Sequence, residues 1–86
     1  MRLQSGLILY DPVEHEVIKV LMPHVEPVIV EVVLDPWGEM PRYEDLRAYR
    51  LPDRDRWEPC PDELFARYEL AESARANARA WADDAT

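Results

Sequence analysis

The chain has 86 residues, 48% of them hydrophobic, and its 10 basic and 18 acidic side chains leave a formal net charge of −8. This size predicts one domain, strand-rich over residues 1–59 and helical over residues 61–83, and the hydrophobic content excludes disorder by composition. The acidic balance argues against direct binding of nucleic acid or of a membrane, because both depend on neutralising phosphates with Lys and Arg.

The same totals exclude further protein classes. Cys60 is the single cysteine, so the chain can form neither an internal disulfide nor a multi-cysteine metal cage. No apolar run approaches the ~20 residues that span a bilayer, and residues 1–5 are too short and polar for a secretion signal. We therefore expect a soluble, cytoplasmic protein.

Two strand-like runs near the start of the chain, Leu7–Tyr10 and Val17–Met22, predict a hairpin. Asp11 and Pro12 open the turn between them, because proline presets φ and the aspartate can accept hydrogen bonds from the amides that follow.

The longest strand-like run, Val25–Leu34, has one apolar face and one mixed face. The apolar face carries Val28, Val30, Val32 and Leu34, and the mixed face carries Pro27, Ile29, Glu31 and Val33. A strand with water on one side normally alternates apolar and polar residues. Something must therefore cover part of the second face.

Beyond a loop with two prolines, residues 46–58 predict a second hairpin. Leu46–Leu51 is interpreted as a strand, although one or two helical turns would also fit the spacing of Leu46 and Tyr49. A strong turn pattern follows at residues 52–55, and the extended pattern resumes at residues 56–58.

The last third of the chain predicts a long helix. Pro61 stands at its first position, followed by two acidic residues, and residues 64–83 contain neither Gly nor Pro. One apolar stripe recurs at steps of three and four: Leu64, Tyr68, Ala71, Ala74, Ala78 and Trp81. The predicted fold is α+β, a small antiparallel meander of about five strands in two hairpins, packed by one long C-terminal helix.

No set of residues typical of an enzyme is present. Cys60 lies beside Glu58 and Asp62, which raise the pKa of a thiol and disfavour the nucleophilic thiolate. His15 and His24 would lie more than ~20 Å apart on a straight strand, too far to share a metal ion. We predict a non-enzymatic protein with no catalytic residue, metal site or cofactor.

One helix can cover only one face of a small sheet. We expect Leu64, Tyr68 and Trp81 of this helix to pack on the more apolar face of the sheet. That face carries Ile18, Val20, Met22, Val28, Val30, Val32 and Leu34. The other face then exposes a larger apolar patch than a monomer normally shows. The sheet could curl into a partial barrel, the loop at residues 35–41 could fold over the patch, or another chain could dock there. We favour docking, because so small a core benefits from a partner.

These observations predict an acidic protein-interaction module that binds a basic surface of a nucleic-acid-handling protein, as a small inhibitor or adaptor of phage or mobile-element origin. The alternative is a structural homo-oligomer, such as a homodimer, or an accessory subunit of a larger assembly. The predicted partner-binding residues are Val17, Leu21, Ile29, Glu31, Val33, Glu26 and Trp37.

Overall fold

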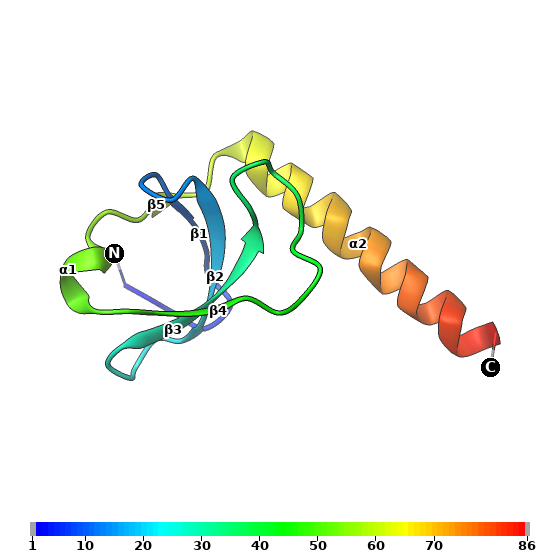
Figure 1. Ribbon diagram of the computed structural model, residues 1–86, viewed down its shortest axis with the longest axis horizontal. Helices are drawn as coiled ribbons and strands as arrows, with labels where there is room; N and C mark the ends of the chain where they lie inside the picture. Colours follow the sequence, from blue (N-terminus) through cyan, green and yellow to red (C-terminus); the bar gives the residue numbers. More distant parts are fainter. Residues whose placement is uncertain (1, 86) are drawn as a thin grey trace.

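The computed structural model describes residues 2–85, with side chains through Trp81, and shows a five-stranded antiparallel sheet followed by a long helix (Figure 1). The elements in chain order are β1 (Ile8–Asp11), β2 (Glu16–Met22), β3 (Val28–Leu34), β4 (Leu46–Tyr49), α1 (Leu51–Arg54), β5 (Glu58–Pro59) and α2 (Asp62–Ala85). The strands lie in the order β4-β3-β2-β1-β5. The predicted α+β fold is confirmed.

The β1–β2 hairpin forms where the Asp11-Pro12 pair predicts it. Oδ1 of Asp11 accepts hydrogen bonds from the amides of Val13 and Glu14, at 3.0 and 3.2 Å. The register places Asp11 opposite Glu16 at the end of the hairpin. An aspartate that holds its own turn in this way is typical of such loops.

The predicted second hairpin is wrong, because β4 and β5 lie at opposite edges of the sheet and β5 pairs with β1. Residues 51–54 form a helical turn, α1, where the sequence predicts a tight turn between paired strands. The amide of Trp57 donates to the carbonyl of Arg54 at 3.1 Å as the chain leaves this turn. The turn therefore carries the chain from the β4 edge across to the β1 edge.

Curling of the sheet encloses the main core. Its buried members are Leu9, Ile18, Val20, Val28, Val30, Val32 and Trp57. The rings of Trp57 and Tyr49 meet edge to face, with centroids 5.3 Å apart, so the segments at the two edges of the sheet contact each other. The sheet thus covers its own inner face, and the prediction that the helix covers that face is wrong.

α2 packs on the outer face of the sheet. Val17, Val33 and Leu34 are buried there, with Leu64 and Tyr68 of α2 packed against them. The β2–β3 pairing is irregular next to Val17, which lets the neighbours Val33 and Leu34 join the same cluster. The helical stripe is therefore predicted correctly at its first two members but meets the other face.

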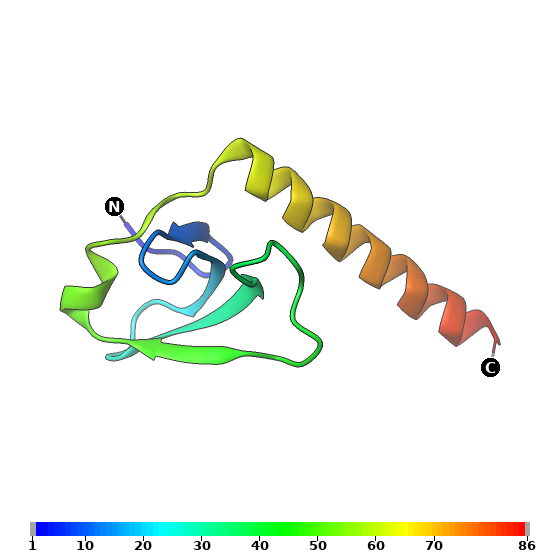
Figure 2. The same cartoon turned by 45° about the horizontal axis from the view of Figure 1, so that its top comes forward.

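The loop at residues 35–45 adds to this outer layer. Met40 and Pro41 line a small hollow together with Val33 and Tyr68. Figures 1 and 2 show the loop running beside the first half of α2. Folding of this loop over the sheet is one of the three arrangements that the sequence allows. Together with the first turns of α2, the loop covers part of the second face.

Candidate protein-interaction surface

The structure separates the seven residues predicted to bind a partner. Val17 and Val33 are only 1% and 5% exposed, so the first turns of α2 already occupy their positions. Leu21, Ile29 and Glu31 are half-buried, whereas Glu26 and Trp37 are exposed. The burial of the two valines divides the predicted patch.

The two exposed members lie in different places. A carboxylate oxygen of Glu26 lies 3.2 Å from a guanidinium nitrogen of Arg54 in α1. Trp37 is 80% exposed in the loop after β3 and lines a hollow with Leu64 and Arg67 of α2. What remains of the predicted surface is a small area around Ile29 and Glu31, next to β4.

The loop that carries Trp37 is held in place by Asp35. Oδ1 of Asp35 accepts hydrogen bonds from the amides of Trp37 and Glu39, each at 2.9 Å. Gly38 adopts a left-handed φ of 78° and lies against the side chain of Arg67, where a Cβ atom would collide with the guanidinium group. The loop therefore presents Trp37 at a fixed position beside α2.

The second half of α2 exposes a larger apolar surface, which includes three members of the stripe predicted to pack on the sheet, Ala74, Ala78 and Trp81. The helix has 24 residues, or a length of ~36 Å, and its contacts with the sheet are made by its first turns. Residues 76–81 are all exposed, and Figures 1 and 2 show the helix leaving the body of the molecule. We call residues 70–85 the arm.

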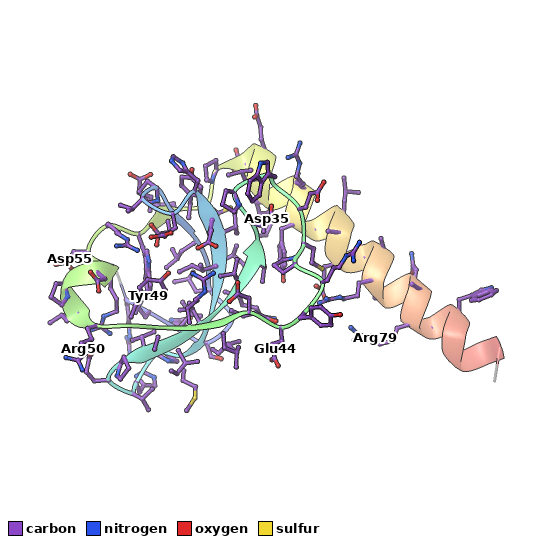
Figure 3. The ribbon with its side chains drawn as sticks, viewed as in Figure 1. Asp35, Glu44, Tyr49, Arg50, Asp55 and Arg79 are labelled. Carbon is purple, nitrogen blue, oxygen red and sulfur yellow. The ribbon has the colours of Figure 1, made fainter. Side chains whose placement is uncertain are left out.

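The exposed arm contradicts the prediction that Trp81 is seated on the sheet. Trp81 is 75% exposed and Leu70 is 74% exposed. The reason is geometric: α2 packs on the sheet through Leu64 and Tyr68 in its first turns, and Trp81 follows Leu64 by nearly five turns, beyond that contact. In Figure 3, Arg79 lies on the part of α2 that projects beyond the sheet. Among residues 2–85, no helix is both long and apolar enough to cross a bilayer.

Charge divides the arm into two sides. At about 100° per residue, one side collects uncharged exposed residues, which we call the uncharged face: Leu70, Ser73, Ala74, Asn77, Ala78 and Trp81. The charged residues Glu69, Glu72, Arg75 and Arg79 fall on the opposite side. The signal available in the sequence is the placement of these charges around the helix, which separates the Leu70–Trp81 stripe from the stripe that packs on the sheet.

Two buried carboxylates form a different cluster at one end of the curled sheet. Asp11 is 0% exposed and Glu16 is 5% exposed. Arg56 donates to Asp11 from Nε at 3.0 Å and from Nη2 at 2.8 Å, whereas Nη2 of Arg47 lies 3.5 Å from Glu16. Burial by itself raises the pKa of Asp11, but the hydrogen bonds from Arg56 and the turn amides outweigh it and hold that pKa below its ordinary value. Burial raises the pKa of Glu16, and the attraction of Arg47 does not offset it.

This cluster has the features of a structural cross-link. A carboxylate with a raised pKa in a cleft is a candidate catalytic group. Neither Asp11 nor Glu16, however, lines any of the three main hollows of the described chain. Arg56 instead joins the β1–β2 turn to the segment before β5, the strand that pairs with β1.

The thiol of Cys60 and the imidazole of His15 are the next reactive groups to consider. Burial raises the pKa of the Cys60 thiol, and the nearby charge of Asp62 adds to the effect. Nδ1 of His15 lies 3.3 Å from the hydroxyl of Tyr10. Within residues 2–81 no three His, Cys, Asp or Glu side chains are placed to hold a metal ion. Comparisons of the chain with protein-family models, curated proteins and solved structures found no match.

Proposed function

We propose that this chain is a non-enzymatic, acidic protein-interaction module that docks its helical arm into an apolar groove on another protein. The observation that carries the proposal is the exposure of Leu70 and Trp81, about three quarters each, on the uncharged face of the arm. Side chains of this size gain free energy when an interface removes them from water, and Trp is over-represented among the residues that dominate binding.

Docking of the arm would follow the helix-in-groove mode of recognition, in which side chains about one turn apart enter a hydrophobic groove. Leu70 and Trp81 are the large apolar side chains at the two ends of the uncharged face, and Ala74 and Ala78 between them allow close approach of the partner's backbone. Arg75 and Arg79 stay on the far side, so docking of the face from Leu70 to Trp81 buries neither charge.

The body of the molecule adds an electrostatic preference. Residues 1–61 carry seven basic and twelve acidic side chains, a net charge of 7 − 12 = −5. Such a surface favours a partner with basic groups next to its groove. A nucleic-acid-handling protein has a basic surface of this kind, and a small inhibitor or adaptor from a phage or mobile element would act by occupying it.

A second candidate partner is another copy of this chain. Leu70, Ala74, Asn77 and Trp81 follow one another at steps of four, three and four, the spacing of a coiled-coil seam. The order is symmetric about its midpoint, so an antiparallel pair of arms would place Leu70 of each copy opposite Trp81 of the other. The acidic bodies would then lie at opposite ends of the dimer, where their mutual repulsion is weakest. In that case the module acts as a homo-oligomer or an accessory subunit.

Light scattering after size exclusion tests the second candidate first. If the arms pair, the wild type is a dimer and Leu70→Glu/Trp81→Glu is a folded monomer. Ala76→Glu, which adds a charge to the same helix outside the uncharged face, is the matched control and stays dimeric.

If the wild type is a monomer, site-specific cross-linking in the source cells tests the first candidate. A photoreactive side chain at position 81 or 70 should trap one and the same protein, and the same side chain at position 76 should not. The purified complex should weaken as salt rises, because its electrostatic part is screened. Equal trapping from all three positions, or a complex that Leu70→Glu/Trp81→Glu leaves intact, would contradict docking by the arm.

A further inference from the structure

The largest of three hollows in the described part of the chain lies at the end of the molecule away from the arm. It has a volume of about 500 Å³, against 80 and 230 Å³ for the next two. Its walls come from the N-terminal segment, the β2–β3 turn and α1, three segments far apart in the sequence. Figure 1 shows α1 and the N-terminal segment at the same end, and Figure 3 labels Asp55 on the α1 side. Pockets for small organic ligands typically enclose roughly 300–1,000 Å³.

Apolar side chains and two guanidinium groups line the hollow. Leu9, Leu51 and Trp57 supply apolar wall, and Trp57 is only 7% exposed. Arg2 and Arg54 also line the hollow, and Asp55 is the one carboxylate among the lining residues of the described chain. In a protein with a net charge of −8, an excess of guanidinium over carboxylate around an apolar hollow runs against the composition.

Arg54 differs from two other arginines of the chain in how its guanidinium is used. Arg47 donates from both Nε and Nη2 to Asp45, at 2.8 and 2.9 Å, and Arg56 does the same to Asp11. These are two-point pairings, the favoured geometry between guanidinium and carboxylate.

Arg54 has only half of such a pairing. Its Nη2 lies 3.2 Å from a carboxylate oxygen of Glu26, and Glu26 is half exposed to water. Its Nε is buried and finds no acceptor among the described residues, and neither does the indole N–H of Trp57 in the same wall. A buried N–H without an acceptor carries an uncompensated desolvation cost, which a ligand oxygen would relieve.

We propose that this hollow binds a small organic carboxylate with an apolar body. The carboxylate takes the Nε–Nη2 edge of Arg54 in place of Glu26, Arg2 adds a second positive charge, and the apolar body packs on Leu9 and Trp57. The proposal does not depend on the arm, because none of the lining residues belongs to α2.

Titration of the ¹⁵N-labelled full chain with 4-phenylbutyrate tests the proposal, with NMR signals from the indole N–H of Trp57 and the Nε–H of Arg54 as reporters. We expect saturable shifts of both signals in the millimolar range. The matched neutral amide, 4-phenylbutyramide, lacks the charge, and acetate lacks the apolar body, so each should bind about ten-fold more weakly or not at all.

Three variants assign the binding to Arg54. Arg54→Gln should weaken 4-phenylbutyrate binding about ten-fold, whereas Arg42→Gln, the same change at an exposed arginine outside the hollow, should not. Glu26→Gln removes the competing carboxylate and should tighten binding. The dispersion of the amide spectrum confirms that each variant is folded.

Several outcomes would overturn the proposal. They are equal binding of the acid and the amide, equal shifts with acetate, an unchanged affinity in folded Arg54→Gln, or an absence of saturable shifts up to about 20 mM with phenylalkanoates of graded chain length.

Discussion

Asp11→Ala is the substitution that most directly tests how the segment before β5 is anchored to the β1–β2 turn. The change removes an acceptor that is fully buried and that receives hydrogen bonds from two turn amides and from two nitrogens of Arg56. Removing one partner of a buried ion pair typically costs about 3–5 kcal/mol, because the other partner is left without compensation. A domain of 86 residues has a stability of roughly 4–13 kcal/mol, so the variant should lose a large part of its free energy of unfolding.

Asp11→Asn separates the two roles of the carboxylate. The amide oxygen of Asn can still accept from the turn, but it loses the charge that Arg56 pairs with, so the expected cost falls to about 1–2 kcal/mol. Urea denaturation at pH 7, followed by circular dichroism, measures both variants. Glu44→Ala, which removes an exposed carboxylate, is the control and should change stability by less than about 0.5 kcal/mol.

A double-mutant cycle with Arg56→Ala then isolates the pair. We expect a coupling energy of about 1–3 kcal/mol, because the two side chains share their hydrogen bonds. A loss of less than about 1 kcal/mol in Asp11→Ala would show that the ion pair does not stabilise the fold.

Three further predictions follow from burial and charge. Val33→Glu should unfold the domain, because Val33 is buried beneath α2. Ile29→Glu, at a half-buried position, should leave the circular dichroism spectrum unchanged. A folded Val33→Glu variant would contradict the packing of α2 on this face. Trp81→Ala should change stability by less than about 0.5 kcal/mol, whereas Tyr68→Ala should cost clearly more. A melting temperature lowered as much by Trp81→Ala as by Tyr68→Ala would show that the arm is packed. Glu16→Gln should become more stable relative to the wild type as pH rises. The raised pKa of Glu16 means that its protonated form favours folding below an unfolded pKa of about 4.3, and this contribution is lost as the group ionises. Melts at pH 4 and pH 7 that show the same difference between variant and wild type would contradict this prediction.

The contribution of Asp11 to stability should change with pH in the direction opposite to that of Glu16. Its pKa is lowered in the folded state, so its contribution is present above the unfolded pKa of about 3.9 and is lost as pH falls through the folded pKa. Asp11→Asn should therefore approach the wild type in relative stability below about pH 3, as measured by melts over this range. A constant difference across the range would contradict a role for the charge.

Local patterns in the chain determined most of the elements. The alternation of apolar residues, the Asp-Pro turn and the long run without Gly or Pro place the first hairpin, the third strand and α2 from residues that lie within a few positions of one another. These signals work because each depends on hydrogen bonds and side-chain periodicity inside one segment.

The tertiary structure decided which strands pair and which faces are covered. A helical turn at residues 51–54 sends β5 to β1 and lets Trp57 meet Tyr49, and nothing local distinguishes this path from a hairpin. The position of the sheet beneath only the first turns of α2 decided that Leu64 is partly buried and that Trp81 is exposed, although the sequence predicts one apolar stripe for both. An apolar stripe shows that a helix has an apolar side. Whether that side is buried depends on surfaces contributed by distant parts of the chain or by a partner.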